Sequence, residues 1–192
     1  MTTPQAILDF WFLPVDHPGH GKPRPEWFRK DDAFDDLIRQ RFGAAIESAL
    51  AGGFQDWRAK ASGALAYILV LDQFTRNAFR DSAKAFSGDG LALAAAANVV
   101  AQEWDKTLPV VQRWFVYMPF EHAESVAEQE RSVALFSALA AEVEGYGDVL
   151  DYAQRHRDIV RRFGRFPHRN RLLGRASTTE EIEFLKLPGS SF

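Results

Sequence analysis

The residues of this chain that could do chemistry gather in three short stretches. The first is LDQFTRNAFR (residues 71–80), the second is MPFEHAESVAEQE (118–130) and the third is FGRFPHRNRLLGR (163–175). Each combines charged, histidine or amide side chains with large apolar residues. Such a mixture is typical of a ligand site, or of an ion-pair network that holds structural elements together.

Helical spacing in the first stretch places three charged residues on one face. Asp72, Arg76 and Arg80 are four residues apart, and Gln73 and Asn77 flank them. Apolar residues surround this face, so we expect it to be at least partly buried. A buried arginine needs a carboxylate partner or a bound anion, and Asp72 can serve only one of the two arginines. An inter-helix ion-pair network and an anion or carboxylate site both remain open.

The second stretch offers residue types that bind metals. Glu121, His122 and Glu124 are such types, but neighbouring residues of a helix diverge by about 100°, so a third ligand would have to be His156 or His168. The spacing lacks the specificity of a known zinc motif, and we expect no metal. The alternative is that these carboxylates pair with the arginines of the other stretches.

The third stretch and the helix before it are rich in arginine. Eight arginines and no lysine lie between residues 155 and 175. The guanidinium group pairs in a planar, two-pronged way with carboxylates and phosphates. We expect four candidate binding residues here: Arg165, His168, Arg169 and Asn170. Their expected partners are Asp72, Glu121 and Glu124, whereas His156, inside an apolar stripe, is expected to be a hydrogen-bonded core residue.

Prolines, glycines and capping residues divide the chain into helices that position these stretches, and no segment alternates with period two. The expected helices start after Thr3-Pro4, at Asp31 or Asp32, near Ser62, after an Asp89 cap, near Pro109, after Pro119, after Gly147, and at Ser177 or Thr178. The last start offers two overlapping capping boxes, Ser177 with Glu180 and Thr178 with Glu181. The third of them is expected to reach Arg80. Pro119 is expected to kink or restart the helix, which would place Glu121 in the first turn after it and align Glu121, Glu124 and Glu128 on one face. The sequence therefore predicts an all-α fold of about eight or nine helices in antiparallel pairs, in a single helical domain over residues 1–192.

Composition narrows the classes of function. The chain is 46% hydrophobic, with 16 Phe and 5 Trp, which suits a globular core. It has no cysteine, so disulfides, thiol catalysis and thiolate metal sites are excluded. The formal net charge of -3 argues against nucleic acid as a partner. The N-terminus lacks the features of a signal peptide, and no apolar run approaches the ~18 residues of a membrane span, so we expect a cytoplasmic protein without membrane contact or cofactor.

Seven segments, in order along the chain, resemble a bacterial family of uncharacterised proteins, domain of unknown function 924. They are ILDFWF, WFRKDDAFD, LDQFTRNAFR, YMPFEHAES, FGRFPHRN, LGR and the terminal FL…PGSSF. The resemblance covers nearly the whole chain and implies a tetratricopeptide-like α-α superhelix, but no established reaction. Thr75 stands where the family usually has proline, and a proline there would disturb a helix, so the third helix is expected to end before Arg80.

Three functions remain open on the sequence. In the first, the protein is a binding module whose Arg/His-lined groove takes an acidic peptide or a small anionic ligand, through Asp72, Gln73, Arg76, Asn77, Arg80, Glu121, His122, Glu124, Arg165, His168, Arg169 and Asn170. In the second, it is an enzyme acting on a small anionic substrate, with His122 or His168 as acid–base and Glu121 or Asp72 orienting it. In the third, the stretches form a polar core that holds helices in register.

Overall fold

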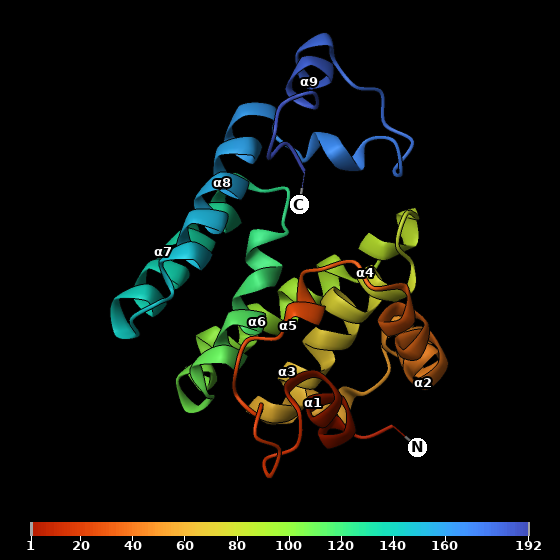
Figure 1. Cartoon of the computed structure of the whole chain (residues 1–192), viewed down its shortest axis with the longest axis vertical. Coiled ribbons are helices and arrows are strands. Elements are labelled where there is room, and N and C mark those ends of the chain that lie inside the picture. Colours follow the sequence, from red (N-terminus) through yellow and green to blue (C-terminus); the bar gives the residue numbers. More distant parts are fainter. Residues whose placement is uncertain (1, 192) are drawn as a thin grey trace. The chain divides into compact units, whose positions relative to one another are not determined.

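The structure is a computed structural model that describes residues 2–191 (Figure 1). These residues form helices and connecting turns without any strand, so the all-α prediction is confirmed. The chain divides into two compact units. Unit 1 comprises Met1–Arg80 and Lys84–Pro119, and unit 2 comprises Asp81–Ala83 and Phe120–Phe192. The single domain over residues 1–192 stays a prediction, as does the superhelix.

The first two α-helices of unit 1 start where the capping residues predict. Thr3 accepts a hydrogen bond from the Ala6 amide at the start of α1, and Asp31 accepts from Ala33 and Phe34 at the start of α2. The α-helices are α1 (Pro4–Phe12), α2 (Asp32–Leu50), α3 (Ala61–Ile68), α4 (Thr75–Ala78), α5 (Asp89–Ala101) and α6 (Val110–Glu121). Short 3-10 turns include η2 (Gln55–Ala59), which leads into α3.

Aromatic side chains from distant segments form the core of unit 1. The Trp11 ring lies 5.5 Å from Phe74 and 5.6 Å from Phe115, between ring centroids. Trp27 meets Phe115 at 4.8 Å, edge to face. Such contacts add to the burial of large apolar surface, and they join α1 to the segment after α3 and to α6.

The first polar stretch begins on a π-helical segment. Leu69–Phe74 has π-helical geometry between α3 and α4, and it carries Asp72 and Gln73. The helix continues through Thr75, whose hydroxyl donates to the Leu71 carbonyl at 2.7 Å, and ends at Ala78. The expectation from helical spacing that this helix reaches Arg80 is therefore wrong, and the earlier end that the family resemblance implies is confirmed. A π-helical turn is uncommon and often accompanies functional sites, and no sequence pattern predicts it.

Two predicted helix starts are wrong. α6 continues through Pro119 to Glu121, so Glu121 ends a helix and does not lie in a first turn. α7 begins only at Val126, and Glu121, Glu124 and Glu128 therefore do not share one helix face. The break is stabilised because the Gln129 side chain donates to the Glu121 carbonyl at 2.6 Å and to the Ala123 carbonyl at 2.8 Å, which caps the end of α6.

The prediction that Asp89 caps α5 is also wrong. Asp89 is the first residue of α5 rather than its cap, and Gly88 precedes it at the capping position. Its carboxylate binds Arg76 instead.

Unit 2 is built on an antiparallel helix pair, α7 (Val126–Glu142) and α8 (Gly147–Phe163), which lie side by side in Figure 1. α8 ends as predicted at Gly164, with a φ of 70° that favours glycine. The turn η6 (Pro167–Arg169) and α9 (Thr179–Phe184) follow. Of the two possible capping boxes, Thr178 with Glu181 forms at the start of α9.

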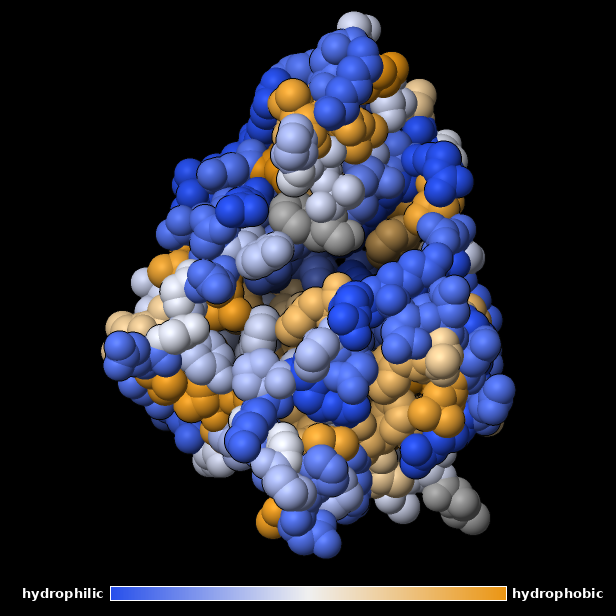
Figure 2. Space-filling view, viewed as in Figure 1, coloured by the Kyte–Doolittle hydropathy of each residue, from blue (hydrophilic) through white to orange (hydrophobic). Residues whose placement is uncertain are grey.

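The surface is polar over most of the face seen in Figure 2, and apolar residues appear there only in small patches. None of the helices within residues 2–191 combines the length and hydrophobicity that crossing a bilayer requires.

Candidate functional site

Arg76 is held by carboxylates within unit 1. Its guanidinium donates to both oxygens of Asp89, at 2.8 and 3.1 Å, and to the Asp72 carbonyl at 2.7 Å. Its Nη1 atom also lies 3.2 Å from Asp72 Oδ1. Gln73 donates to the other Asp72 oxygen at 2.6 Å. These contacts link the π-helical segment to α5 through a buried ion-pair network.

Arg80 and Asn77 converge on a carboxylate of α2. Arg80 donates from Nε and Nη2 to the two oxygens of Asp35, at 2.7 and 3.0 Å, and Asn77 donates to Asp35 Oδ1 at 2.7 Å. Asp35 is only 2% exposed. Burial by itself raises the pKa of its carboxyl, but hydrogen bonds from Arg80 and Asn77 outweigh this and hold that pKa below its usual value. Arg76, Asn77 and Arg80 thus bind carboxylates of other helices, and Asp72 and Gln73 join the same network through contacts within their own segment.

The third stretch is anchored in a similar way by α9. Arg165 donates from Nε and Nη2 to the two oxygens of Glu181, at 2.6 and 2.8 Å. Asn170 donates to Glu181 at 3.3 Å and to the Ser177 hydroxyl at 3.0 Å. The hydrogen bond from Arg165 is the main reason that the pKa of Glu181 falls to about 2.

Glu124 receives a different arginine from the one predicted. Arg175 donates to both of its oxygens, at 2.6 and 2.9 Å, and the Phe166 amide donates to Glu124 Oε1 at 2.7 Å. Burial raises the pKa of Glu124, but these hydrogen bonds overcome that effect and the pKa is lowered. Glu124 therefore ties the linker between α6 and α7 to the FGRFPHRN stretch.

The remaining predicted residues of unit 2 gather around the buried ring of Phe166. The His156 ring lies 5.5 Å from Phe166, the His168 ring lies 5.6 Å from it, and the Arg169 guanidinium lies over it at 4.4 Å. The His122 ring is 6.3 Å from His156. We call these five residues together with Glu121 the His–Arg cluster.

His156 carries a carboxylate contact that the sequence did not predict. Its Nδ1 atom lies 2.9 Å from the Tyr152 carbonyl and 3.2 Å from Glu121 Oε1. Burial, followed by the positive charges of His122, Arg169 and His168, lowers the pKa of His156 to about 3. His156 is therefore neutral near pH 7, and its Nδ1–H donates to the Tyr152 carbonyl. The predicted core histidine is found, but it lies near Arg169 and near two further histidines, His122 and His168.

The candidate site residues predicted from the sequence omit five members of these networks, namely Asp35, Asp89, Phe166, Arg175 and Glu181. The three carboxylates come from α2, α5 and α9, and no spacing in the sequence relates them to the arginines they bind. Asp89 and Glu181 were identified as capping residues, which was the one local signal they carried.

A metal centre is not formed by the second stretch. Within residues 2–191, no three His, Asp or Glu side chains converge as a metal ion would require. Glu124 instead accepts from Arg175 and the Phe166 amide, and Glu121 faces His156.

The chain is similar to one solved structure over nearly its whole length. That structure is described as a protein of unknown function, ATU0120, from Agrobacterium tumefaciens; it is 38% identical, the match covers 95% of this chain and 96% of that one, and the TM-score is 0.83. No curated protein matches the chain. The family model described as bacterial protein of unknown function (DUF924) matches residues 7–189. The chain therefore belongs to the DUF924 family of bacterial proteins.

Proposed function

We propose that this protein is a binding module for a small anionic ligand, which the His–Arg cluster receives. The observation that carries the proposal is the gathering of Arg169, His122 and His168 near the buried His156 ring. Arg169 is permanently charged, and its positive charge both disfavours a proton on His156 and favours an anion. Arg169 and the imidazole N–H groups supply the directed donors that an oxyanion needs.

The burial of the cluster favours a small ligand over an acidic peptide. Glu121, His122 and Arg169 are each less than a tenth exposed, while His168 is half-buried. A peptide needs an extended exposed groove, whereas a phosphate or a small carboxylate needs only a few convergent donors. The arginines of unit 1 add little to such a groove, because Arg76 and Arg80 already bind Asp72, Asp89 and Asp35.

The test is a titration of the whole protein with inorganic phosphate, followed by NMR of the histidine ring signals. We expect saturable shifts at His122 and His168, which sodium chloride at equal ionic strength does not reproduce. Arg169→Gln and His168→Gln should each weaken binding at least about tenfold, since a hydrogen bond to a charged group contributes ~1.5–3 kcal/mol.

Arg162→Gln is the matched control, because Arg162 is an exposed arginine of the same unit that pairs with Glu180. It should bind phosphate as the wild type does. If the wild type gives no saturable response, or if Arg169→Gln and His168→Gln bind as tightly as Arg162→Gln, the proposed site is wrong.

The enzyme alternative has one observation in its favour, the Glu121–His156 contact at 3.2 Å. A carboxylate beside an imidazole is the arrangement of many acid–base pairs. However, a histidine with a pKa of about 3 is a poor base near pH 7, so the contact favours binding over proton transfer.

A further inference from the structure

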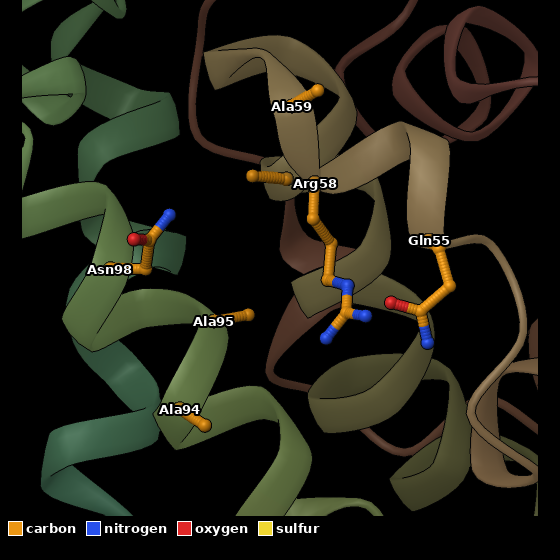
Figure 3. A pocket seen from close by; sticks show the side chains of 7 residues that line it. Gln55, Arg58, Ala59, Ala94, Ala95 and Asn98 are labelled. Atoms are coloured by element: carbon orange, nitrogen blue, oxygen red, sulfur yellow. The ribbon is translucent and has the colours of Figure 1, made fainter.

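A pocket of about 390 Å³ lies in unit 1, away from all three polar stretches (Figure 3). It is bounded by η2, by the start of α3 and by α5. Gln55, Arg58 and Asn98 supply its polar groups, and Ala64, Ala94 and Ala95 are among its apolar ones. This volume falls in the range of small-molecule sites, which combine an apolar lining with a few directed polar groups.

Arg58 differs from the arginines of the polar stretches. Arg76, Arg80, Arg165 and Arg175 each bind a carboxylate. Arg58 is half-buried, and within residues 2–191 its guanidinium has no carboxylate partner and no hydrogen bond. In Figure 3 its side chain projects between Gln55 and the alanines of α5. A half-buried guanidinium that lacks an internal anion is the group that a ligand carboxylate would satisfy.

The ring beneath Arg58 keeps the guanidinium in the pocket. Arg58 lies over the Tyr67 ring, 5.3 Å from its centroid. Tyr67 is 1% exposed, and its hydroxyl makes no hydrogen bond within residues 2–191. This cation–π contact uses no hydrogen-bond donor, so the N–H groups of the Arg58 guanidinium remain available to a ligand.

The 3-10 turn η2, which carries Arg58, packs closely against α3. A Cβ atom added to Gly63 would lie only 2.2 Å from the Trp57 carbonyl oxygen, so this approach requires glycine. Phe54 and Trp57 stack at 4.0 Å, and Gln55 donates to the Gly52 carbonyl at 2.7 Å. η2 is thus fixed in place, and the pocket is preformed rather than assembled by the ligand.

We propose that this pocket binds a small organic carboxylate, with its head group on Arg58 and a short alkyl body on the alanines. The two oxygens of a carboxylate match the planar fork of arginine, and the amides of Asn98 and Gln55 lie in the same lining. The alanine lining offers apolar surface to a chain of a few carbons. Inorganic phosphate would bring a second charge and no apolar body, and it fits this lining less well.

The experiment titrates the whole protein with hexanoate and follows the backbone amide signals by NMR. We expect saturable shifts confined to residues 55–64 and 94–98, and no binding of the neutral isostere hexanamide. Arg58→Gln, which removes the charge, and Ala94→Leu, which fills the pocket, should each weaken binding at least about tenfold.

Two matched controls separate the pocket from general effects. Arg41→Gln removes another arginine that stacks on aromatic rings, Phe10 at 5.0 Å and Phe42 at 5.1 Å, outside the pocket. Ala97→Leu makes the same change on α5 at a position that does not line it. Both should bind hexanoate as the wild type does.

The proposal is overturned if hexanoate causes no saturable shift, if hexanamide binds equally well, or if neither Arg58→Gln nor Ala94→Leu weakens binding. If Arg58→Gln fails to fold, Ala94→Leu still tests the pocket, because this variant keeps Arg58 and only fills the space beside it. The result is independent of the His–Arg cluster, whose signals belong to unit 2 and respond to a different probe.

Discussion

At the scale of single residues, the arginines of the conspicuous stretches are mostly explained by carboxylates far away in the sequence. Arg80 binds Asp35, Arg76 binds Asp89 and Arg165 binds Glu181. Most arginines of these stretches therefore form ion pairs within the protein. Two arginines differ: Arg58 has no carboxylate partner among residues 2–191, and Arg169 lies near His156 and His168.

Because Arg76 pairs with the buried carboxylate of Asp72, we expect Arg76→Ala to lower the stability strongly. Asp72 is fully buried and Arg76 is 21% exposed, so the substitution leaves a buried carboxylate without its cation. We expect the free energy of unfolding to fall by ~3–5 kcal/mol in urea denaturation. Lys106→Ala, which breaks an exposed pair with Glu103, should change it little, and a loss under ~1 kcal/mol in Arg76→Ala would contradict the buried network.

The lowered pKa of Glu181 makes the free energy of unfolding depend on pH. This pKa falls from 4.5 to about 2 in the folded protein, chiefly through the hydrogen bond from Arg165. The folded state therefore favours the ionised form, so its contribution is complete above about pH 4.5 and is lost as the pH falls towards about 2.

The measurement compares the free energy of unfolding of the wild type and Glu181→Gln by urea denaturation from neutral to acidic pH. The wild type should be more stable by a constant amount near pH 7, and the difference should shrink below about pH 4.5. Glu180→Gln controls for the loss of one negative charge. A difference that stays constant down to acidic pH would disprove the role assigned to Arg165.

At the scale of elements, two close backbone approaches shape unit 1. A Cβ at Gly88 would lie 2.2 Å from the Leu71 carbonyl oxygen, and a Cβ at Gly63 would lie equally close to that of Trp57. The first approach brings the start of α5 against the π-helical segment, which puts Asp89 within reach of Arg76. The second brings η2 against α3 and forms one wall of the pocket.

Gly63→Ala should therefore destabilise the protein although alanine favours helices. The added methyl meets backbone rather than a side chain that could move, and we expect a loss of ~1–3 kcal/mol or more in thermal and urea unfolding. Gly43→Ala is the control, because nothing lies within 4 Å of that Cβ on α2. It should stabilise the protein by ~0.5–1 kcal/mol, and equal effects of the two changes would refute the close approach.

At the scale of the whole molecule, the question is whether the two compact units fold as one domain. Domain boundaries usually lie in exposed, flexible linkers. The division between Pro119 and Phe120 falls instead inside α6, and Phe120 is fully buried. We therefore propose that residues 1–192 form a single folding domain.

Scanning calorimetry tests this proposal. We expect one heat-absorption peak whose calorimetric enthalpy equals the van't Hoff enthalpy, as for a two-state domain. Two separated peaks, or Arg76→Ala shifting only part of a composite peak, would instead assign independent stability to the two units.

The sequence by itself determined the all-helical class, the caps at Thr3, Asp31 and Thr178, and the end of α8 at Gly164, because these depend on hydrogen bonds and backbone angles of neighbouring residues. It also identified the three polar stretches. It pointed to Asp72 as a partner for Arg76 through their i,i+4 spacing. It did not determine the π-helical turn, the continuation of α6 through Pro119, or the carboxylates from other helices that bind the arginines.

Those features were decided by tertiary structure. Any of the chain's 26 acidic residues could pair with a given arginine, and only packing selects Asp35, Asp89 and Glu181. The end of α6 is capped by Gln129 of the next helix, whose side chain donates to the carbonyl of its last residue, Glu121, and to that of Ala123 just beyond it. The Arg58 pocket likewise exists because η2, α3 and α5 meet, and its alanines and single arginine carry no local pattern that would mark a site.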